Sequence, residues 1–176
     1  MQNNTEKLLV EMRDIVKTFP GTKALDGVTL KLRKGEIHAL VGENGAGKST
    51  LMNILTGQFA MDSGEVIMEG EPVRFSSPRE AMRKNIVLVP QELNLVPEAS
   101  IAENIFLAET ERYKNRFGLI NRRKMNADAT EVMKKIGVND ITGDMLMQQL
   151  DFQTRKLVEI AKVVMKQPQI LVIDET

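Results

Sequence analysis

The alternation of apolar and polar residues predicts strands in the first part of the chain. Val28, Leu30 and Leu32 alternate with polar residues, which is typical of a strand with one buried face. Residues 8–19 carry short apolar runs that also indicate a strand. Residues 37–41 (Ile-His-Ala-Leu-Val) are apolar enough for a strand buried on both faces. We expect shorter strands at residues 66–68, 73–75, 86–89 and 170–173.

Helices are predicted after residue 47 and through most of the second half of the chain. Ser77-Pro78 places proline at the first position of a helix, and Ser100 with Glu103 has the spacing of a capping box. The predicted helices cover residues 48–57, 101–107, 122–136 and 152–165, with a further one starting at 78. The fold class is therefore α/β. We expect a core at residues 1–91, a helical subdomain at residues 92–150, and a return to the core at residues 151–176.

Composition narrows the class of protein. The 24 basic and 24 acidic residues cancel, which speaks against a dedicated nucleic-acid or membrane-surface binder but leaves room for a local charged patch. The chain has no cysteine, so a disulfide framework and a thiolate metal site are excluded. His38, the single histidine, excludes a two-histidine metal centre and is expected in the core. No apolar run is long enough for a transmembrane helix or a secretory signal.

The first segment with recognisable chemistry is residues 42–49 (Gly-Glu-Asn-Gly-Ala-Gly-Lys-Ser). It matches the pattern G-x-x-x-x-G-K-[ST] and lies between a predicted strand and a predicted helix, as that motif requires. The glycines let successive backbone N–H groups face an anion, and the next helix adds its positive end. Lys48 supplies a cation for the β- and γ-phosphates, and the Ser49 hydroxyl can complete a Mg²⁺ shell. The alternative is a flexible turn; we predict binding of a nucleoside triphosphate.

A second segment, at the end of the chain, has the residues for the other half of such a site. The apolar run at 170–173 is followed by Asp174 and Glu175. Asp174 would hold Mg²⁺ through its water shell, and Glu175 would polarise the attacking water as general base. The alternative is a buried strand that ends in a solvated acidic pair.

Four segments, in this order and spacing, resemble the motifs of an ATP-binding cassette (ABC) ATPase. They are Gly42–Thr50 with Leu51, Val89-Pro90-Gln91-Glu92-Leu93, Val158-Glu159-Ile160-Ala161-Lys162 and Ile173-Asp174-Glu175. Phe19-Pro20-Gly21 with Ala24-Leu25, and residues 35–47, resemble the cytoplasmic ATPase subunits of bacterial sugar importers for ribose, galactose, xylose and related sugars. The resemblance covers nearly the whole chain. It implies a P-loop NTPase core with an antiparallel β subdomain and a helical insert.

The resemblance also implies ATP and Mg²⁺ as cofactors and assigns residues to them. Phe19 matches the aromatic position that stacks on adenine, although a core phenylalanine at a strand end explains it equally well. Gln91 matches the glutamine that reaches Mg²⁺ and the γ-phosphate, so Lys48, Gln91 and Glu175 are the expected catalytic residues. The expected metal ligands are Ser49, Gln91 and Asp174. The expected nucleotide-binding residues are Phe19, Gly42, Asn44, Gly45, Ala46, Gly47, Lys48, Ser49 and Thr50.

By the same resemblance, the function is ATP-driven sugar import from the cytoplasmic face of the inner membrane. The implied partners are membrane permease subunits, contacted by the helical subdomain near residues 93–108, a second ATPase cassette and, indirectly, a periplasmic sugar-binding protein. No nucleic acid is expected. Ordinary helix packing is the alternative for residues 93–108. Two other functions stay open: a non-transport ABC-type ATPase and a nucleotide-binding module without catalysis.

Two departures from the family pattern affect the expected site. The family signature, Leu-Ser-x-Gly-Gln-like, aligns with Leu150-Asp151-Phe152-Gln153-Thr154. There, Asp151 replaces a serine and repels phosphate, unless it only caps the next helix. The chain also ends at Thr176, without the switch histidine and later strands of the family. We therefore expect a C-terminally truncated first cassette of a two-cassette chain, which binds Mg-ATP weakly at best and hydrolyses it negligibly.

Overall fold

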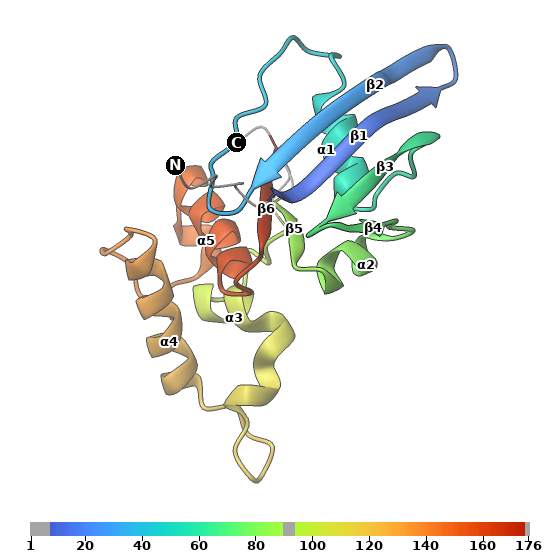
Figure 1. The fold of residues 1–176 in the computed structure, drawn as a ribbon. Helices are drawn as coiled ribbons and strands as arrows, with labels where there is room; N and C mark the ends of the chain where they lie inside the picture. The colour runs from blue at the N-terminus through green and yellow to red at the C-terminus, as the bar shows by residue number, and fades with distance from the viewer. Residues whose placement is uncertain (1–7, 90–93, 175–176) are drawn as a thin grey trace, which may run out of the picture. The chain divides into compact units, whose positions relative to one another are not determined.

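The chain folds into two compact units, of which a computed structural model describes residues 8–89 and 94–174 (Figure 1). The first unit extends to Ile86 and is called the strand unit. The second begins at Val87 and is called the helical unit. The three segments expected from the sequence (1–91, 92–150 and 151–176) stay a prediction about domain organisation.

The strand unit is built on a four-stranded antiparallel sheet. Its strands are β1 (Leu8–Phe19), β2 (Thr22–Arg33), β3 (Ser63–Met68) and β4 (Glu71–Val73), in the order β2-β1-β3-β4. The strand predicted at residues 8–19 is confirmed as β1. The strand predicted from the alternation of Val28, Leu30 and Leu32 is confirmed as part of β2. Their hairpin closes where Phe19 pairs with Thr22.

Two helices complete the strand unit, α1 (Lys48–Leu55) and α2 (Pro78–Arg83). Leu51, Ile54 and Leu55 of α1 are buried, as the helical spacing of apolar residues predicts, and α1 contacts β2. Met12 and Ile15 of β1 are completely shielded from water and belong to the core of this unit.

The helical unit contains α3 (Ile101–Phe106), α4 (Arg122–Lys135) and α5 (Phe152–Val164), with short 3₁₀ helices η1 (Leu107–Tyr113) and η2 (Met147–Gln149). Helix α3 contacts both α4 and α5. A single apolar cluster holds the helices together, and its most buried members include Ile101, Ala129, Met133, Val158 and Ala161.

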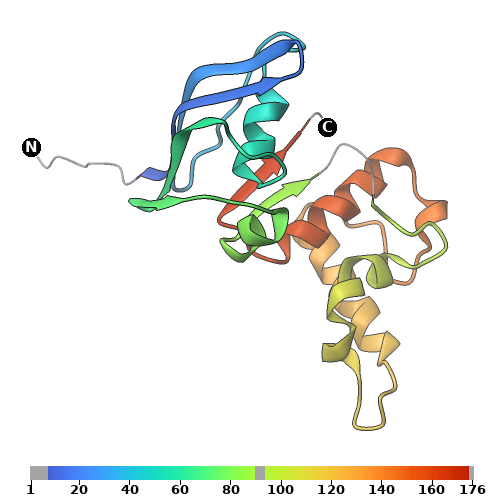
Figure 2. The ribbon, with the colours of Figure 1, turned by 90° about the vertical axis from the view of Figure 1, so that its right-hand side faces the viewer.

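Strands β5 (Ile86–Val89) and β6 (Ile170–Ile173) form a second, two-stranded sheet. They run in the same direction, so their carboxyl ends lie at the same edge (Figure 2). The chain that follows each strand therefore leaves from that edge. In the sequence, Gln91 comes after β5 and Asp174 after β6, so the two residues follow strands that end at the same edge.

The strand predicted at residues 37–41 is wrong. The segment forms no strand, and Ile37 is 102% and Val41 90% exposed. Among the described residues, no strand pairs with it. An apolar run becomes a strand only when a neighbour satisfies its backbone N–H and C=O groups. The expectation that His38 lies in the core fails with it, because its side chain is 40% exposed and its Nδ1 lies 3.3 Å from Glu36 Oε1.

The helix ends follow the sequence signals closely. Ser100 accepts from the Glu103 N–H at 3.1 Å while the Glu103 carboxylate accepts from the Ser100 N–H at 2.9 Å, which is the predicted capping box. Ser77 stands at the N-cap of α2, but its side chain makes no capping hydrogen bond. Within the described residues, every helix is too short or too polar to span a lipid bilayer.

Candidate nucleotide-binding site

Backbone geometry sets the shape of the glycine-rich loop. Gly45 and Gly47 have φ angles of 84° and 90°, in the left-handed region that favours glycine. A Cβ at Gly47 would lie 2.5 Å from the Ala24 carbonyl oxygen, so no side chain fits there. Gly47 is also the N-cap of α1, and the loop therefore leads directly into the first turn of that helix.

The start of α1 is arranged to receive an anion. The first turn holds Lys48 and contains no acidic residue, and Gly47 has no side chain with which to cap the helix. Backbone N–H groups at this end carry the positive end of the helix dipole. The fit to a phosphate thus rests on two features of the chain itself, the glycine cradle and the uncapped helix start.

Lys48 is held at the loop rather than extended into solvent. Its Nζ donates to the carbonyl oxygens of Gly42 at 2.8 Å and of Glu43 at 2.9 Å. These acceptors are neutral, and a hydrogen bond from an ammonium group to an anionic oxygen is stronger. A phosphate oxygen that entered the loop would therefore compete well for this ammonium group.

The predicted nucleotide-binding residues of the loop lie together in the strand unit. Gly42, Asn44, Gly45 and Ala46 are exposed, whereas Gly47, Lys48, Ser49 and Thr50 are half-buried where α1 begins. The Ala46 N–H donates to the Glu43 carbonyl at 3.1 Å, which closes the turn. Exposure of the loop leaves its backbone accessible to a ligand.

Phe19 lies close to this loop along the β1–β2 hairpin. It is half-buried at the end of β1, and Ala24, the residue approached by Gly47, lies just past the hairpin turn. The Phe19 ring meets Phe59 edge-on with centroids 5.4 Å apart, and Lys17 Nζ lies 5.4 Å from its centroid. The Phe19 ring thus packs against the core with one part and is exposed with another.

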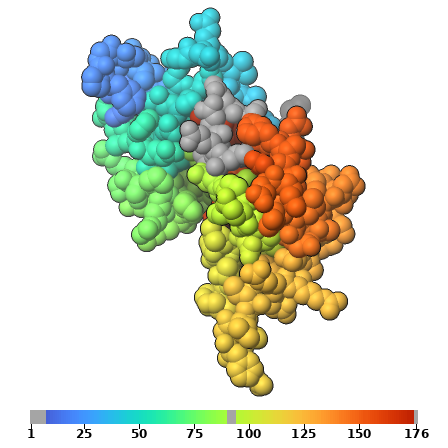
Figure 3. All heavy atoms as spheres, turned by 180° about the vertical axis from the view of Figure 1, so that it is seen from behind, coloured from blue at the N-terminus to red at the C-terminus, as the bar shows by residue number. Residues whose placement is uncertain are grey.

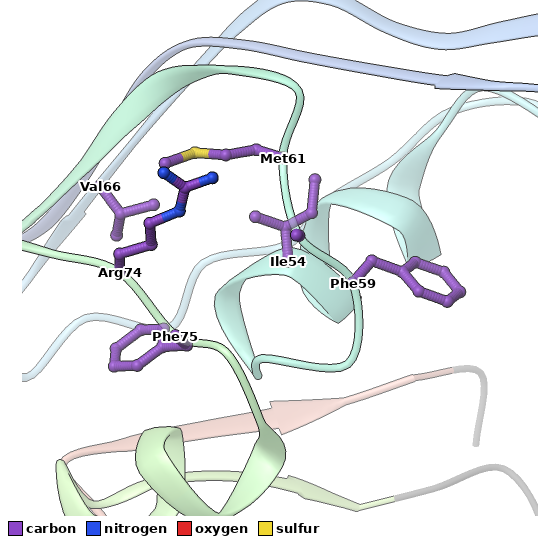
Figure 4. A pocket seen from close by; sticks show the side chains of 7 residues that line it. Ile54, Phe59, Met61, Val66, Arg74 and Phe75 are labelled. Carbon is purple, nitrogen blue, oxygen red and sulfur yellow. The ribbon is translucent and has the colours of Figure 1, made fainter.

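A small cavity in the strand unit is separate from the loop. It is lined by Ile54, Phe59, Ala60, Met61, Val66, Arg74 and Phe75 (Figure 4). Its volume is ≈ 10 Å³, which is room for about one water molecule. It is too small for a nucleotide.

The acidic half of the predicted site is described only in part. Asp174 is half-buried directly after β6. Gln91 and Glu175 lie outside the described residues. In residues 8–89 and 94–174, no group of three or more His, Asp and Glu side chains is arranged to hold a metal ion. A Mg²⁺ ion would therefore need phosphate oxygens and water among its ligands.

The signature-like segment is built as a capped helix start. Asp151 is the N-cap of α5, and its carboxylate accepts from the Thr154 N–H at 2.7 Å and from the Thr154 hydroxyl at 3.2 Å. These hydrogen bonds, first that from the Thr154 backbone, lower the pKa of Asp151. The capping interpretation of Asp151 is confirmed. Leu150 is buried and Gln153 is exposed.

Most of the predicted docking segment, residues 93–108, packs within the helical unit. Ile101, Ala102 and Phe106 are almost fully buried, and among the described residues 94–108 only Val96 and Leu107 expose large apolar side chains. Asn104, which the sequence reasoning missed, is 2% exposed and binds both the N–H and the carbonyl of Val96, at 2.7 and 3.0 Å. The available signal in the sequence was that Asn104 occupies a position of the predicted helix where the apolar spacing places a buried residue.

Positive-φ glycines followed by a lysine at a helix start, in the pattern G-x-x-x-x-G-K-[ST], define a P-loop protein that binds nucleoside triphosphates. The sequence also matches the ABC transporter family model over residues 25–176, and the chain belongs to that family. The fold agrees: a nucleotide-free ATP-binding cassette from an ABC transporter superposes with a TM-score of 0.77 at 28% identity. That comparison covers 96% of this chain and 69% of the cassette.

Curated relatives refine the comparison. The chain is 45% identical to a ribose import ATP-binding protein, RbsA 1, of Streptomyces avermitilis, over 99% of this chain and 32% of that protein. It is 42% identical to a putative ribose/galactose/methyl galactoside import ATP-binding protein of Burkholderia lata, over 95% of this chain and 31% of that protein. The structure of cbiO1 from Clostridium perfringens, part of the transporter complex cbiONQ, superposes with a TM-score of 0.77 at 25% identity and covers 97% of this chain and 66% of cbiO1. The chain thus spans about a third of the length of these curated relatives.

Proposed function

We propose that this chain is the ATP-binding part of an ATPase subunit that drives sugar import in a bacterial ABC transporter. The observation that carries the proposal is the ammonium group of Lys48, held by its own loop at the uncapped start of α1. The names of the relatives, which are ribose and ribose/galactose import proteins, support sugar as the cargo.

In this proposal, binding begins when Lys48 exchanges its two carbonyl acceptors for the β- and γ-phosphates. The loop residues Gly45 and Gly47 offer backbone N–H groups, with Gly42, Asn44 and Ala46 completing the turn. Ser49 and Thr50 in the first turn of α1 add hydroxyl groups. The partly exposed face of Phe19 stacks on the adenine.

Hydrolysis would use the edge where β5 and β6 end. Gln91 and Glu175 follow these neighbouring strands, and Asp174 lies directly after β6. The hydroxyl, amide and carboxylate oxygens of Ser49, Gln91 and Asp174 are the donors that Mg²⁺ prefers. A Mg²⁺ ion held there would supply positive charge to the phosphate groups, and Glu175 would accept a proton from the attacking water.

Family membership implies a membrane permease as partner, since relatives are import proteins. We propose contact with it through the exposed parts of residues 93–108, namely the region of Val96 and Leu107. A second ATPase cassette and a periplasmic sugar-binding protein would complete the system. The site of action would be the cytoplasmic face of the inner membrane.

The test is titration of Mg-ATP into this chain and into its Lys48→Ala variant. Loss of a charged phosphate contact should weaken binding about ten- to hundred-fold. Lys34→Ala, which removes an exposed lysine of the same unit, is the control and should bind as the parent chain does. Equal affinity of the Lys48→Ala variant and the parent would refute the proposed site.

A nucleotide-binding module without catalysis is the second candidate, and Asp151 favours it. Its carboxylate occupies the helix start where the family signature would meet phosphate. Phosphate release by the full-length protein distinguishes the two candidates. A rate that depends on Lys48 supports the ATPase, and binding without turnover supports the module.

A further inference from the structure

Half of the basic residues of the helical unit lie in one segment, residues 112–124, which we call the basic hairpin. It contains six basic residues and no acidic residue, in a chain whose net charge is zero. They are Arg112, Lys114, Arg116, Arg122, Arg123 and Lys124. The segment extends from the helices of its unit as a narrow projection (Figures 1 and 3).

Apolar side chains at the tip of the basic hairpin are exposed to solvent. Phe117 is 72%, Leu119 67% and Ile120 40% exposed. The tip is an ordered turn, because Asn115 Oδ1 accepts from the N–H groups of Phe117 at 2.9 Å and of Leu119 at 3.0 Å. The Asn115 N–H in turn donates to the Leu119 carbonyl at 2.9 Å. An ordered turn that exposes neighbouring apolar side chains is typical of a binding surface.

The base of the hairpin is anchored firmly. Tyr113 is 2% exposed, its ring lies 5.0 Å from that of Phe106, and its hydroxyl donates to Asp128 at 3.0 Å. The Asn121 N–H donates to the Tyr113 carbonyl at 2.8 Å, and Asn121 then caps α4. The tip is therefore presented by a rigid support rather than by a loose loop.

The helix that follows has charges of the wrong sign for its own stability. Arg122, Arg123 and Lys124 fill the first turn of α4, where the helix dipole favours acids, and that turn has no acid. Arg122 pairs with Glu103 at 3.3 Å, but Arg123 and Lys124 form no ion pair with another described residue. The side chains of Arg123 and Lys124 are therefore not neutralised by an ion pair within the described residues.

Some of the hairpin's charge is balanced locally. Arg112 pairs with Glu109 at 3.0 Å and lies 3.9 Å from Asp128, and Lys114 pairs with Glu111. Arg116 lies over the Phe117 ring, 4.7 Å from its centroid, and forms no ion pair with another described residue. Three cations of the basic hairpin thus have no ion-pair partner among the described residues: Arg116 at the tip, and Arg123 and Lys124 in the first turn of α4.

We propose that the basic hairpin docks on the surface of an anionic lipid membrane. Phe117 and Leu119 enter the boundary between headgroups and acyl chains, and Arg116, Arg123 and Lys124 bind lipid phosphates. Lipid is favoured over nucleic acid because the tip is largely aliphatic, while single-stranded nucleic acid is held by stacking on several aromatic rings. The contact is independent of the proposed nucleotide site and gives the chain its own attachment to the bilayer.

The experiment is co-sedimentation of this chain with vesicles of phosphatidylcholine mixed with phosphatidylglycerol, and with vesicles of phosphatidylcholine alone. Binding should require the anionic lipid and should fall at high salt. Arg123→Gln with Lys124→Gln should weaken binding about fivefold per charge. Phe117→Ser with Leu119→Ser should weaken it about tenfold or more.

Matched variants elsewhere serve as controls. Arg79→Gln with Arg83→Gln removes two exposed cations of α2, and Met82→Ser with Val164→Ser removes two exposed apolar side chains. Both should bind vesicles as the parent chain does. The proposal fails if the chain does not sediment with the anionic vesicles, if neutral vesicles bind it equally, or if the tip variant binds normally. Because all these variants keep Lys48, loss of vesicle binding with normal Mg-ATP binding separates this result from the proposed function.

Discussion

Two helices of this chain begin in opposite ways. Helix α1 of the strand unit starts at Gly47, with no capping side chain, no acid in its first turn and Lys48 beside it. Helix α5 of the helical unit starts at Asp151, whose carboxylate already accepts the Thr154 N–H at 2.7 Å. Both starts carry the positive end of a helix dipole. The first is left open to an outside anion, and the second is occupied by an anion of the chain itself.

The two units also treat their buried acids differently. In the strand unit, Glu11 accepts from Arg13 at 2.7 Å and pairs with Lys31 at 3.0 Å, and these cations, Arg13 first, lower its pKa to about 2. In the helical unit, Glu159 is 4% exposed and its Oε2 has no hydrogen-bond partner within residues 8–89 and 94–174, and burial raises its pKa. Lys162, at 3.7 Å from Oε1, offsets this only in part. A buried carboxylate is thus stabilised as an anion in one unit and disfavoured as one in the other.

The largest effect on stability and on Mg-ATP affinity is expected from Gly47→Ala, which changes the uncapped start of α1. The new Cβ would meet the Ala24 carbonyl at 2.5 Å on a backbone with φ 90°, so the loop must shift. We expect about 2–4 kcal/mol of lost unfolding free energy and a large loss of Mg-ATP affinity. Denaturant unfolding and titration calorimetry measure both.

Gly45→Ala is the matched control for that prediction. Gly45 has a similar φ of 84°, but its Cβ would meet no atom within 4 Å. Only the backbone strain of about 1 kcal/mol should remain. If the two alanine variants were equally stable, close packing at Gly47 would not be what shapes the loop.

Asp151→Ala tests the occupied helix start. Loss of the cap should lower the melting temperature by a few degrees, whereas Asp151→Ser should retain most of the cap without the charge. In the full-length protein, Asp151→Ser should raise the rate of phosphate release if the carboxylate repels phosphate. Unchanged turnover would mean that Asp151 acts only as a cap.

Glu159→Gln tests the acid disfavoured by burial. The native pKa is raised, so the folded chain holds this proton more tightly than the unfolded chain, and the unfolding free energy falls as pH rises above 4.5. Removing the charge should stabilise the chain by about 1 kcal/mol at neutral pH and flatten that dependence. Denaturant unfolding from acid to neutral pH measures it. A destabilised variant would show that Glu159 is needed as an anion.

Glu11→Gln tests the acid that is stabilised as an anion, in the strand unit. The native pKa is lowered to about 2, so the stabilising contribution is present above 4.5 and is lost as pH falls toward 2. The variant should melt below the parent at neutral pH and converge with it in acid. Thermal unfolding followed across this pH range decides it, and a constant difference at all pH values would contradict the charge explanation.

Local signals in the sequence predicted local structure well. The capping box at Ser100, the antiparallel pair of β1 and β2, and the cap formed by Asp151 each depend on residues only a few positions apart or on a simple period of two. The glycines of the loop predicted a tightly curled backbone for the same reason, and Gly45 and Gly47 do have positive φ angles. Such features need no knowledge of distant partners.

Features that depend on distant residues were missed or wrong. Residues 37–41 have the composition of a buried strand, but a strand exists only where another strand accepts its hydrogen bonds, and the described residues supply none. The exposure of His38 follows from that. Asn104 was missed because its role, bridging to Val96, appears only once α3 and the preceding loop are folded.

The sequence by itself determined the phosphate loop, the helix starts and the family, because these are written in short spacings of glycine, lysine, acids and caps. Only the tertiary structure decided which groups are buried and which remain available. It placed Lys48 on its own loop carbonyls, filled the start of α5 with Asp151 and left Phe117 and Leu119 in water. Burial depends on what the rest of the chain covers, and that depends on contacts between residues far apart in sequence.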